Sequence, residues 1–541
     1  MPFDLIEQPW IPVSRDNVPS LVSLRSAFAD AARIQSLAPA FPTQSPALVR
    51  QVLLPVVLRA LGPPRSGQEW AIRFSAGAFT SSEIGMIDAY LDKHRDRFDL
   101  FHDTHPFAQA GGLATNGPAK SIALLIPTIA SGNNVPLFSS HTEADEVALS
   151  PAEAAAWLLH ALCWDTAAIK TGAVDDPKAK AGKTTGNPTG PLGQLGVVMP
   201  VGRTLFETIM LNSPIISGGD IGVPSWERAP VTGEWTERRA DGLLDLLTWP
   251  ARRIRLFPAE PVPGDGSGSG ECRVNRVIVA AGDRLAATPE YEPHTAWRID
   301  PKPKAGQPPR RPRRHVAGKA AWRGLDALLA LRGITVDDGM YATSALMDQL
   351  GELFVDGDLP PDYPLRIETY GVVYGNQSAV VDDVIVDRLP LPIAALTAAR
   401  PTRAVVLEVA RQAEELSHAL NNLSADLRRA RGGDPLPWDK GQRPGDLLIH
   451  AVDFRIRKLF TELRDVGDDD RVEELRLRWE IAARQDTWRI AGPLLNTNAP
   501  TAFGGRSKDD KTYRQATAEH HFATRVSSIL SRATEARKES A

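Results

Sequence analysis

The chain has almost no cysteine. Cys163 and Cys272 are the two cysteines among 541 residues; they lie far apart, and neither belongs to a Cys-x-x-Cys pair. A disulfide framework needs several spaced cysteines, and a cysteine-rich zinc site needs paired ones. The sequence therefore supports neither, and we expect no metal site.

Long apolar runs and an excess of positive charge are also missing. No stretch approaches the ~18 apolar residues of a membrane span, and the N-terminus has no basic segment followed by an apolar one. We therefore expect a cytoplasmic protein without membrane contact. The net charge is −4, whereas a protein that coats nucleic acid is usually strongly basic. Any contact with nucleic acid should therefore come from local basic segments.

Recognisable catalytic patterns are absent as well. His102 and His105 are three residues apart, but no His-Glu-x-x-His pattern or nearby third ligand completes a metal site. The Gly-Lys-Thr at 182–184 lacks the glycine that a phosphate-binding loop requires five residues earlier, where the chain has Pro177. No Gly-x-Ser-x-Gly elbow is present. We therefore predict a protein that is not an enzyme and needs no cofactor.

The composition that is present suits a large globular protein of two unequal parts. Hydrophobic residues make up 43% and charged residues 24% of the chain, both ordinary values. Short β-rich runs, at residues 254–256, 277–280, 365–373 and 380–386, alternate with helical segments at 46–61 and 151–163. Ser150 and Pro151 predict the N-cap and first residue of the second helix. The predicted fold class is α+β, with a large irregular mixed domain over residues 1–389.

Residues 390–541 are predicted to be helical. One run places apolar residues four, seven, four, three and four positions apart, which puts them on one helix face: Val405, Val409, Leu416, Leu420, Leu423 and Leu427. A second run repeats the pattern with Leu448, Val452, Ile456, Leu459 and Leu463. Two more amphipathic runs follow. Four such helices can bury their apolar faces by packing against each other, so we predict a C-terminal four-helix bundle.

The run ETYGVVYGNQSAVVDDV contains the most informative polar residues. Two β-rich segments flank a Gly-Asn-Gln-Ser tip, which is typical of a hairpin. Asn376, Gln377 and Ser378 would then be held in solvent on a stiff support. Amides in that position can enter a nucleic-acid groove and hydrogen-bond to base edges. The alternative is an ordinary solvated turn.

Two segments concentrate positive charge. Residues 298–323 hold nine basic residues and one acid, interrupted by prolines, so we predict a mobile loop that can reach a phosphate backbone. Its candidate contacts are Lys302, Lys304, Arg310, Arg311, Arg313 and Arg314; the alternative is a solvated linker. The second segment, from Lys170 to Lys183, sets four lysines among glycines. Glycine has no Cβ, so its backbone can approach DNA closely.

Another candidate for contact with nucleic acid lies in the polar segment 131–151. Its one aromatic residue, Phe138, could stack on an unpaired base if it is exposed. The alternative is that Phe138 folds back onto the core.

Six motifs in order along the chain resemble one family. They are FDLIEQPWIPV, FDLFHDTHPFAQ, TGNPTGPLGQLGVVMPVGRTLFETI, VPSWERAP, LLTWPARRIRL and the YGNQS hairpin. Together they resemble CasA, the large subunit of the type I-E CRISPR Cascade surveillance complex. The resemblance implies a subunit that is not a nuclease. It implies recognition of the protospacer-adjacent motif in double-stranded DNA, strand opening beside it, and recruitment of a nuclease-helicase.

The resemblance also implies roles for particular residues. Gln377, with Asn376, matches the family's wedge; Gly172, helped by Lys170, matches the loop that contacts the minor groove of the motif. Arg276 and Arg284 lie near the place of a minor-groove lysine, and Phe138 matches a residue that reaches the guide RNA and the neighbouring backbone subunit. The four-helix bundle would help to hold DNA and contact the small subunits. A stand-alone enzyme with a helical accessory domain is the alternative, and it would not co-purify with guide RNA and partner proteins.

Overall fold

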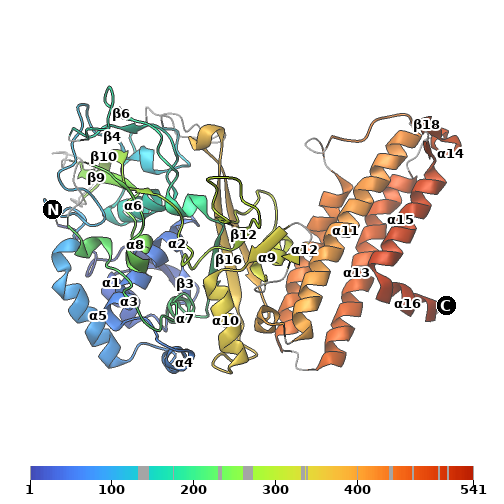
Figure 1. Ribbon diagram of the computed structural model, residues 1–541, viewed down its shortest axis with the longest axis horizontal. Helices are drawn as coiled ribbons and strands as arrows, with labels where there is room; N and C mark the ends of the chain where they lie inside the picture. Colours follow the sequence, from blue (N-terminus) through green and yellow to red (C-terminus); the bar gives the residue numbers. More distant parts are fainter. Residues whose placement is uncertain are drawn as a thin grey trace. The chain divides into compact units, whose positions relative to one another are not determined.

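The computed structural model describes residues 2–131, 145–174, 176–229, 234–259, 272–330, 335–336, 339–398, 400–437, 441, 443–465, 468–496, 500–508 and 511–539. The chain divides into two compact units (Figure 1). Unit 1 comprises Met1–Lys319, Ala330–Leu359 and Arg366–Arg388; unit 2 comprises Ala320–Leu329, Pro360–Leu365 and Leu389–Ala541. Two short segments before the last crossing at Leu389 therefore belong to the C-terminal unit.

Unit 1 combines short helices with several small sheets. Its helices are α1 Leu24–Ala29, α2 Gln44–Leu48, α3 Leu54–Leu61, α4 Gly67–Ser75, α5 Ser81–Lys93, α6 Pro151–Trp164, α7 Leu205–Leu211, α8 Gly242–Leu247 and α10 Ala345–Val355. A π-helical turn, Val49–Leu53, joins α2 to α3. Pro55 has no N–H to donate to a helix and follows that turn closely. The predicted helix at 46–61 is thus one continuous helical segment with a local change of pitch.

The strands of unit 1 are short except in two pairs. They are β1 Ile11–Arg15, β2 Val18–Val22, β3 Ser36–Leu37, β4 Lys120–Ser121, β5 Lys170–Thr171, β6 Lys183–Thr184, β7 Val197–Val201, β8 Glu237–Arg238, β9 Arg252–Pro258, β10 Val274–Ala281, β11 Arg284–Leu285, β12 Trp297–Ile299, β13 Arg310–Pro312, β14 Thr335–Val336, β15 Gly339–Ala342, β16 Arg366–Tyr374 and β17 Val381–Pro390. The four β-rich runs predicted from sequence fall in β9, β10, β16 and β17. The predicted strands are confirmed.

Two sheets position the candidate site. In the first, β10 pairs with β9 and β4 in antiparallel fashion and with β5 in parallel, and β5 continues to β6. Beneath it Ala173, Ile278 and Ala280 are buried together with Ala110 and Leu113. In the second, the order is β17-β16-β7, with Ile367 opposite Pro200. Each sheet therefore supports one polar loop.

Helix α6 begins as predicted, with Ser150 as N-cap and Pro151 in the first position. The Ser150 hydroxyl accepts the N–H of Glu153, and the Glu153 carboxylate accepts the N–H of Ser150, which makes a capping box. Its last residue, Trp164, is buried, and the chain that follows enters the candidate site.

Unit 2 contains the predicted helices: α9 Leu325–Leu328, α11 Pro401–Ala430, α12 Pro444–Glu462, α13 Asp469–Asn496, α14 Thr501–Gly504, α15 Gln515–Ile529 and α16 Ser531–Glu539. The long ones, α11, α12, α13 and α15, lie alongside one another (Figure 1). A hairpin of β18 Arg506–Lys508 and β19 Lys511–Tyr513 precedes α15. All eleven apolar residues of the two predicted stripes are less than 5% exposed. The α+β class and the C-terminal helical bundle are confirmed.

Candidate nucleic-acid interface

The tip of the β16–β17 hairpin presents two amide side chains to solvent. Asn376 and Gln377 are exposed, and the turn Asn376–Ser378 is closed by hydrogen bonds from Ser378 N–H to Gly375 O (2.8 Å) and from Ala379 N–H to Asn376 O (3.0 Å). Gln377 and Ser378 have φ angles of 52° and 56°. Left-handed conformations cost a residue with a side chain about 1 kcal/mol or more. The fold thus holds this tip in a shape that is unfavourable locally.

The tip is fixed to the segment that follows α6. The Ala167 N–H donates to the carbonyl of Ser378 (2.7 Å), and the Tyr374 hydroxyl donates to the carbonyl of Trp164 (2.6 Å). A Cβ at Gly193 would lie 2.1 Å from the Tyr374 hydroxyl oxygen, so only glycine allows this approach. Burial raises the pKa of Tyr374, which keeps the hydroxyl protonated as a donor. The amides therefore stand on a rigid base.

The glycine-rich segment forms a loop between β5 and β6. Its neck is closed by a hydrogen bond from Gly172 N–H to Gly182 O (2.8 Å). A Cβ added to Gly172 would lie 2.7 Å from the Cβ of Ala179. Glycine is therefore required for the loop to fold, whatever the loop binds. A bulky residue at 172 would distort the loop, so losing function in such a variant would not prove a direct DNA contact.

Lys170 lies in a different environment from the one expected. Its side chain is buried, with the ammonium 2.7 Å from a carboxylate oxygen of Asp165. Arg252 contacts the same oxygen at 2.5 Å. Burial lowers the pKa of Lys170, whereas Lys170 and Arg252 keep the pKa of Asp165 low against the opposing effect of burial. Lys170 thus stabilises the base of the loop, and its charge is not presented to a phosphate.

A buried ion pair and an aromatic ring hold the rest of the loop. Asp176 accepts a hydrogen bond from the N–H of Lys178 (3.0 Å) and pairs with buried Arg253 at 3.2 Å. Two cations contact the Trp235 ring, with the Lys178 ammonium 4.3 Å and the Arg284 guanidinium 3.8 Å from its centre. Arg284 also donates to the carbonyl of Thr185 (2.8 Å). Arg284 is thus engaged within the protein, whereas Arg276 on β10 has an exposed side chain.

The loop and the hairpin meet at one cavity of about 670 Å³. Gly172, Thr171 and Gly182 line it from the loop, and Ala379 and Val381, which directly follow the tip, line it from the hairpin. The end of α6 and the segment around 124–127 complete its wall. Segments some 200 residues apart in sequence are thereby brought to one opening. Gln377 itself stands beyond the wall, at the exposed tip.

Three further side chains lie at this cavity, a position that local sequence could not predict. Lys120 and Lys183 both line it and are exposed, and Ile169 lines it with 59% of its surface exposed. Lys120 is an isolated lysine without a local pattern. Lys183 was noticed as part of the glycine-rich segment, but its position at the cavity depends on the pairing of β5 with β6. The cavity therefore carries exposed positive charge despite the burial of Lys170.

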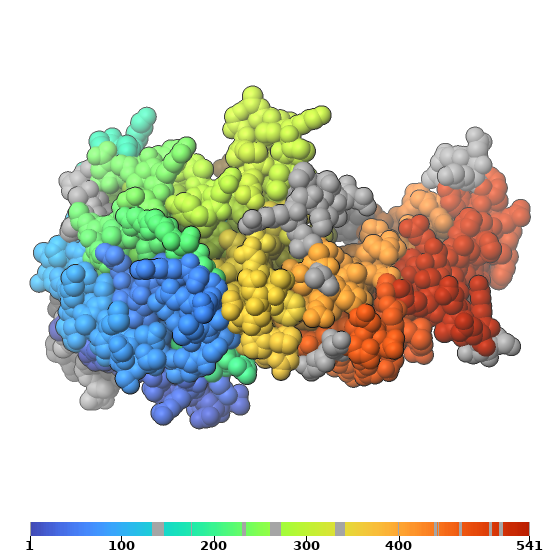
Figure 2. Space-filling view, turned by 60° about the horizontal axis from the view of Figure 1, so that its bottom comes forward, coloured from blue at the N-terminus to red at the C-terminus, as the bar shows by residue number. Residues whose placement is uncertain are grey.

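The basic stretch differs in part from its prediction. We expected a loop over residues 298–323, but residues 298–299 and 310–312 belong to the antiparallel strands β12 and β13, with Trp297 opposite Pro312. The connecting residues 301–309, including Lys302 and Lys304, are exposed, and this yellow-green segment stands out from the surface in Figure 2. Pairing succeeds because buried Trp297 anchors β12, which also pairs with β15. The stretch is a projecting hairpin.

The four arginines named as candidate contacts in this stretch all have partners within the protein. Arg310 lies 3.3 Å from Glu290, and Arg311 lies 3.6 Å from Asp300. Arg313 stacks over Tyr341 at 5.4 Å, and Arg314 donates to the carbonyl of Gln194 (3.3 Å). Their charge is therefore partly compensated, and the exposed lysines at the tip are the better candidates for phosphate contacts.

The remaining positions named from the sequence are Phe138 and the His102–Phe107 segment. Phe138 lies outside the described residues. Phe107 is buried and stacks on Phe98, whereas His102 uses its Nδ1 to accept the N–H of His105 (3.0 Å). In the described part of the chain, no three histidine, cysteine or carboxylate side chains are grouped as metal ligands. In the same part, no helix has both the length and the apolar character needed to cross a membrane.

Comparison with known proteins identifies the family. The family model of CRISPR-associated protein Cse1 matches residues 4–490. CRISPR-associated protein CasA/Cse1 of Thermus thermophilus is 28% identical over 517 residues, which cover 92% of this chain and 94% of that protein. The crystal structure of Thermobifida fusca Cse1 has a TM-score of 0.83 at 30% identity, covering 98% of this chain and 99% of that one.

Two other structures agree in fold. Cse1 from Acidimicrobium ferrooxidans has a TM-score of 0.79 at 30% identity and covers 99% of both chains. A chain of a CRISPR RNA-guided surveillance complex has a TM-score of 0.72 at 22% identity, covering 97% of this chain and 99% of that one. Because the family model spans most of the sequence and two 30%-identical structures cover nearly all of it, the chain belongs to the CRISPR-associated protein Cse1 family, also called CasA.

Proposed function

We propose that this chain is the large, non-catalytic subunit of a cytoplasmic RNA-guided surveillance complex. Its family and its structural likeness to a chain of such a complex support this role. In such complexes guide RNA pairing reads the target, and protein reads only a short flanking motif. The proposed partners are guide RNA, double-stranded target DNA, the backbone and small subunits, and a nuclease-helicase. This role replaces a stand-alone enzyme as the better interpretation.

One observation carries the finer part of the proposal: the glycine loop and the amide-tipped hairpin flank a single cavity. The loop, with Gly172 at its neck, would face the minor groove of the flanking motif. Lys120, Lys183 and exposed Arg276 would supply the positive charge for it. Minor-groove patterns are degenerate, so several related motifs should be accepted.

The hairpin tip would act next to the loop. Gln377, with Asn376 and Ser378, would insert beside the last base pair of the motif and hold the duplex open. Unstacking a base step costs a few kcal/mol, which binding of the duplex must offset. A stiff support keeps the inserted side chain in place, whereas a flexible turn would bend away. The locally unfavourable backbone at Gln377 and Ser378 supports this role, because such strain clusters at functional sites.

Two other contacts belong to the same proposal. Lys302 and Lys304 at the tip of the β12–β13 hairpin would contact DNA phosphates without sequence preference, with the neighbouring Arg310, Arg311, Arg313 and Arg314 helping less because they have internal partners. Contact between Phe138 and the guide RNA rests on the family resemblance alone.

A cross-linking experiment tests where DNA lies. A photoreactive amino acid is placed at Ile169, which is 59% exposed at the cavity, and, as a control, at Ile72, which is 67% exposed on α4. The complex is assembled with guide RNA and all subunits, given target duplex, and irradiated. We expect cross-links from position 169 to bases at the flanking motif and none from position 72.

Two results would count against the proposal. If the chain carries no guide RNA and no partner subunits when all are co-expressed, the complex-subunit role is wrong. If the complex assembles and binds target but position 169 gives no cross-link near the motif, the cavity is not the DNA site.

A further inference from the structure

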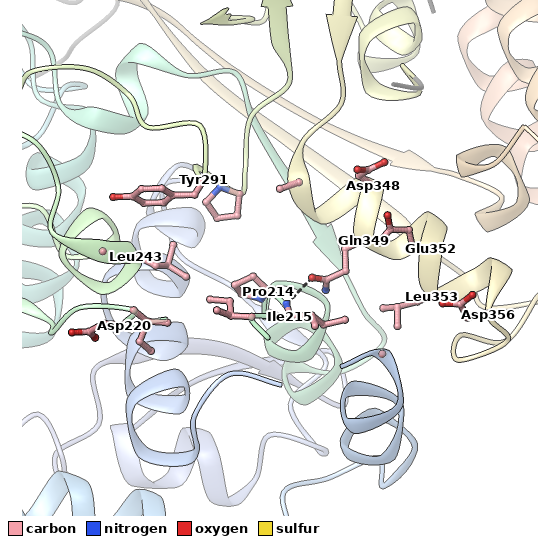
Figure 3. A pocket seen from close by; sticks show the side chains of 16 residues that line it. Pro214, Ile215, Asp220, Leu243, Tyr291, Asp348, Gln349, Glu352, Leu353 and Asp356 are labelled. Atoms are coloured by element: carbon pink, nitrogen blue, oxygen red, sulfur yellow. Dashed lines mark hydrogen bonds between the residues drawn. The ribbon is translucent and has the colours of Figure 1, made fainter. Parts of the chain in front are cut away.

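A second cavity, of about 550 Å³, lies within unit 1 apart from the candidate nucleic-acid interface. It opens between the segment 214–221, the start of α8 and the helix α10 (Figure 3). Among the described residues, none lines both cavities. Its volume is in the range of ligand pockets, about 300–1,000 Å³.

The floor of this second cavity is apolar and held in place. Ile215, Ile216, Leu243 and Leu353 line it. Gln349 on α10 accepts a hydrogen bond from Ile215 N–H (2.7 Å), drawn as the dashed line in Figure 3, and donates to the carbonyl of Ser213 (3.1 Å). The floor is thus fixed to α10, and the cavity does not need to be opened by a ligand.

Carboxylates form the rim. Asp348 and Glu352 on α10 and its C-cap residue Asp356 are spaced four residues apart, on the side of the cavity opposite Tyr291 (Figure 3), and Asp220 adds a fourth carboxylate. Glu352, Asp356 and Asp220 are exposed. Among the described residues that line the cavity there is no lysine, arginine or histidine. An apolar floor with a purely acidic rim matches a ligand that is both apolar and cationic.

The carboxylate row is unfavourable for α10 itself. Like charges four residues apart repel each other. Asp348 lies in the first turn, where the helix dipole favours a negative charge, but Asp356 caps the C-terminal end, where the dipole opposes one. The last turn of α10 has no basic residue to compensate. A cationic ligand would relieve this repulsion.

Tyr291 faces the row from the other side of the cavity. The residue is 45% exposed, and its hydroxyl donates to the carbonyl of Ala240 (3.2 Å). Burial raises the pKa of Tyr291, and the nearby carboxylates of Asp245, Asp241 and Glu292 raise it further. An exposed aromatic face in a negative surrounding is a favourable place for a guanidinium or an ammonium.

We propose that this cavity docks a basic helical segment of a partner protein, which inserts one apolar side chain between flanking lysines or arginines. The spacing favours a helix. Successive carboxylates of this row are about 6 Å apart along the helix axis, so Asp348 and Asp356 match basic residues one turn before and one turn after a central side chain on a ligand helix. The apolar side chain between them would fill the space over Ile215 and Leu353.

Anisotropy with synthetic peptides tests this docking on the purified full-length chain without nucleic acid. The probe is a labelled helical peptide with one leucine between lysines one turn before and after it. In one control peptide glutamates replace the lysines, and in another alanine replaces the leucine. We expect the probe to bind more tightly than either control peptide. Added salt should weaken its binding, because the rim is exposed.

Variants place the binding in the cavity. Glu352→Gln with Asp356→Asn should weaken the probe about three- to tenfold, whereas the matched pair Asp103→Asn with Glu237→Gln, exposed and outside the cavity, should not. Ala345→Trp keeps every carboxylate but occupies space at the exposed start of α10, and it should remove the advantage of leucine over alanine.

Several results would overturn the proposal. Equal binding of the leucine and alanine peptides, or displacement of the probe by spermidine at the same concentration, would show a general cation surface. Equal binding of the basic and acidic peptides, or no loss in the Glu352/Asp356 double variant, would show that the rim does not select charge.

Discussion

Two buried histidines of unit 1 are held neutral by their surroundings. His160 lies against Phe41 and Trp157, and its Nε2 is 2.9 Å from the Thr43 hydroxyl; burial lowers its pKa to about 3. His294 accepts from Arg50 at Nδ1 (2.7 Å) and faces the Asn212 carbonyl oxygen with Nε2 (3.0 Å). Burial lowers the pKa of His294 to about 4.

This environment predicts a loss of stability in mild acid. The unfolded histidines take up protons near pH 6.5, and the folded ones do so only near pH 3 to 4. Their contribution to the free energy of unfolding is therefore complete above pH 6.5. It falls as pH decreases toward the folded pKa values, by about 2 kcal/mol per histidine at pH 5. The free energy of unfolding, measured with urea at several pH values between 7.5 and 5, should change less steeply with pH in His160→Gln than in wild type.

The matched control is His521→Gln, because His521 is exposed. Its free energy of unfolding should depend on pH as in wild type. If His160→Gln also keeps the wild-type pH dependence, His160 does not take up a proton on unfolding.

At the residue scale, local sequence could predict exposure but not partners. The Gly-Asn-Gln-Ser tip is recognisable because a hairpin tip and its flanking strands are adjacent in the chain. The burial of Lys170 was not recognisable, because its environment is completed by Arg252, 82 residues further along. The place of Lys120 at the cavity was equally hidden, since it depends on the pairing of β4 with β10.

At the element scale, the glycine loop depends on a clamp formed by other elements. Trp235 holds Lys178, which belongs to the loop, and Arg284, which donates to Thr185 just after β6. Each cation contact of this kind is worth about 0.5–2 kcal/mol. The loop therefore keeps its shape through an aromatic ring about 60 residues away in sequence.

Loosening the clamp should reduce motif recognition. We expect Trp235→Leu, in the assembled complex, to lower the ratio of affinities for duplexes with the correct and an altered flanking motif. Trp235→Phe keeps an aromatic face and should restore most of the ratio. Competition binding of the two duplexes measures it, and an unchanged ratio in Trp235→Leu would show that the clamp does not position a recognition loop.

Helices and strands also differed in how well they could be predicted. The stripes of α11 and α12 follow the helical period, which is a local property, and every predicted position is buried. The strands β12 and β13 were missed because proline and charge dominate their sequence, and their pairing depends on Trp297 meeting Pro312 across a ten-residue connection. In β12 and β13, contacts with residues distant in sequence therefore decide the structure, although the local composition does not favour strands.

At the scale of the whole molecule, the protein is acidic but carries a projecting basic hairpin. Changing Lys302 and Lys304 to Gln should flatten the dependence of log affinity on log salt by up to about two units, because each phosphate contact contributes about 0.9. The preference for the correct motif should not change. Duplex binding by the complex is measured across a salt series.

The comparison pair is Lys93→Gln with Arg33→Gln, which are exposed and lie elsewhere on unit 1. An identical slope in wild type and in the Lys302/Lys304 variant would identify the hairpin as a solvated connection.

Opening of the duplex by the hairpin tip can be measured directly. The complex carrying Gln377→Ala is mixed with an intact target and with a target already unpaired beside the motif, and strand opening is followed with a fluorescent base at the first target pair. Gln68→Ala, an exposed glutamine on α4, is the control. We expect slow opening of the intact target by Gln377→Ala and a near-normal rate on the unpaired one. Equal defects on both targets, or no defect on either, would contradict it.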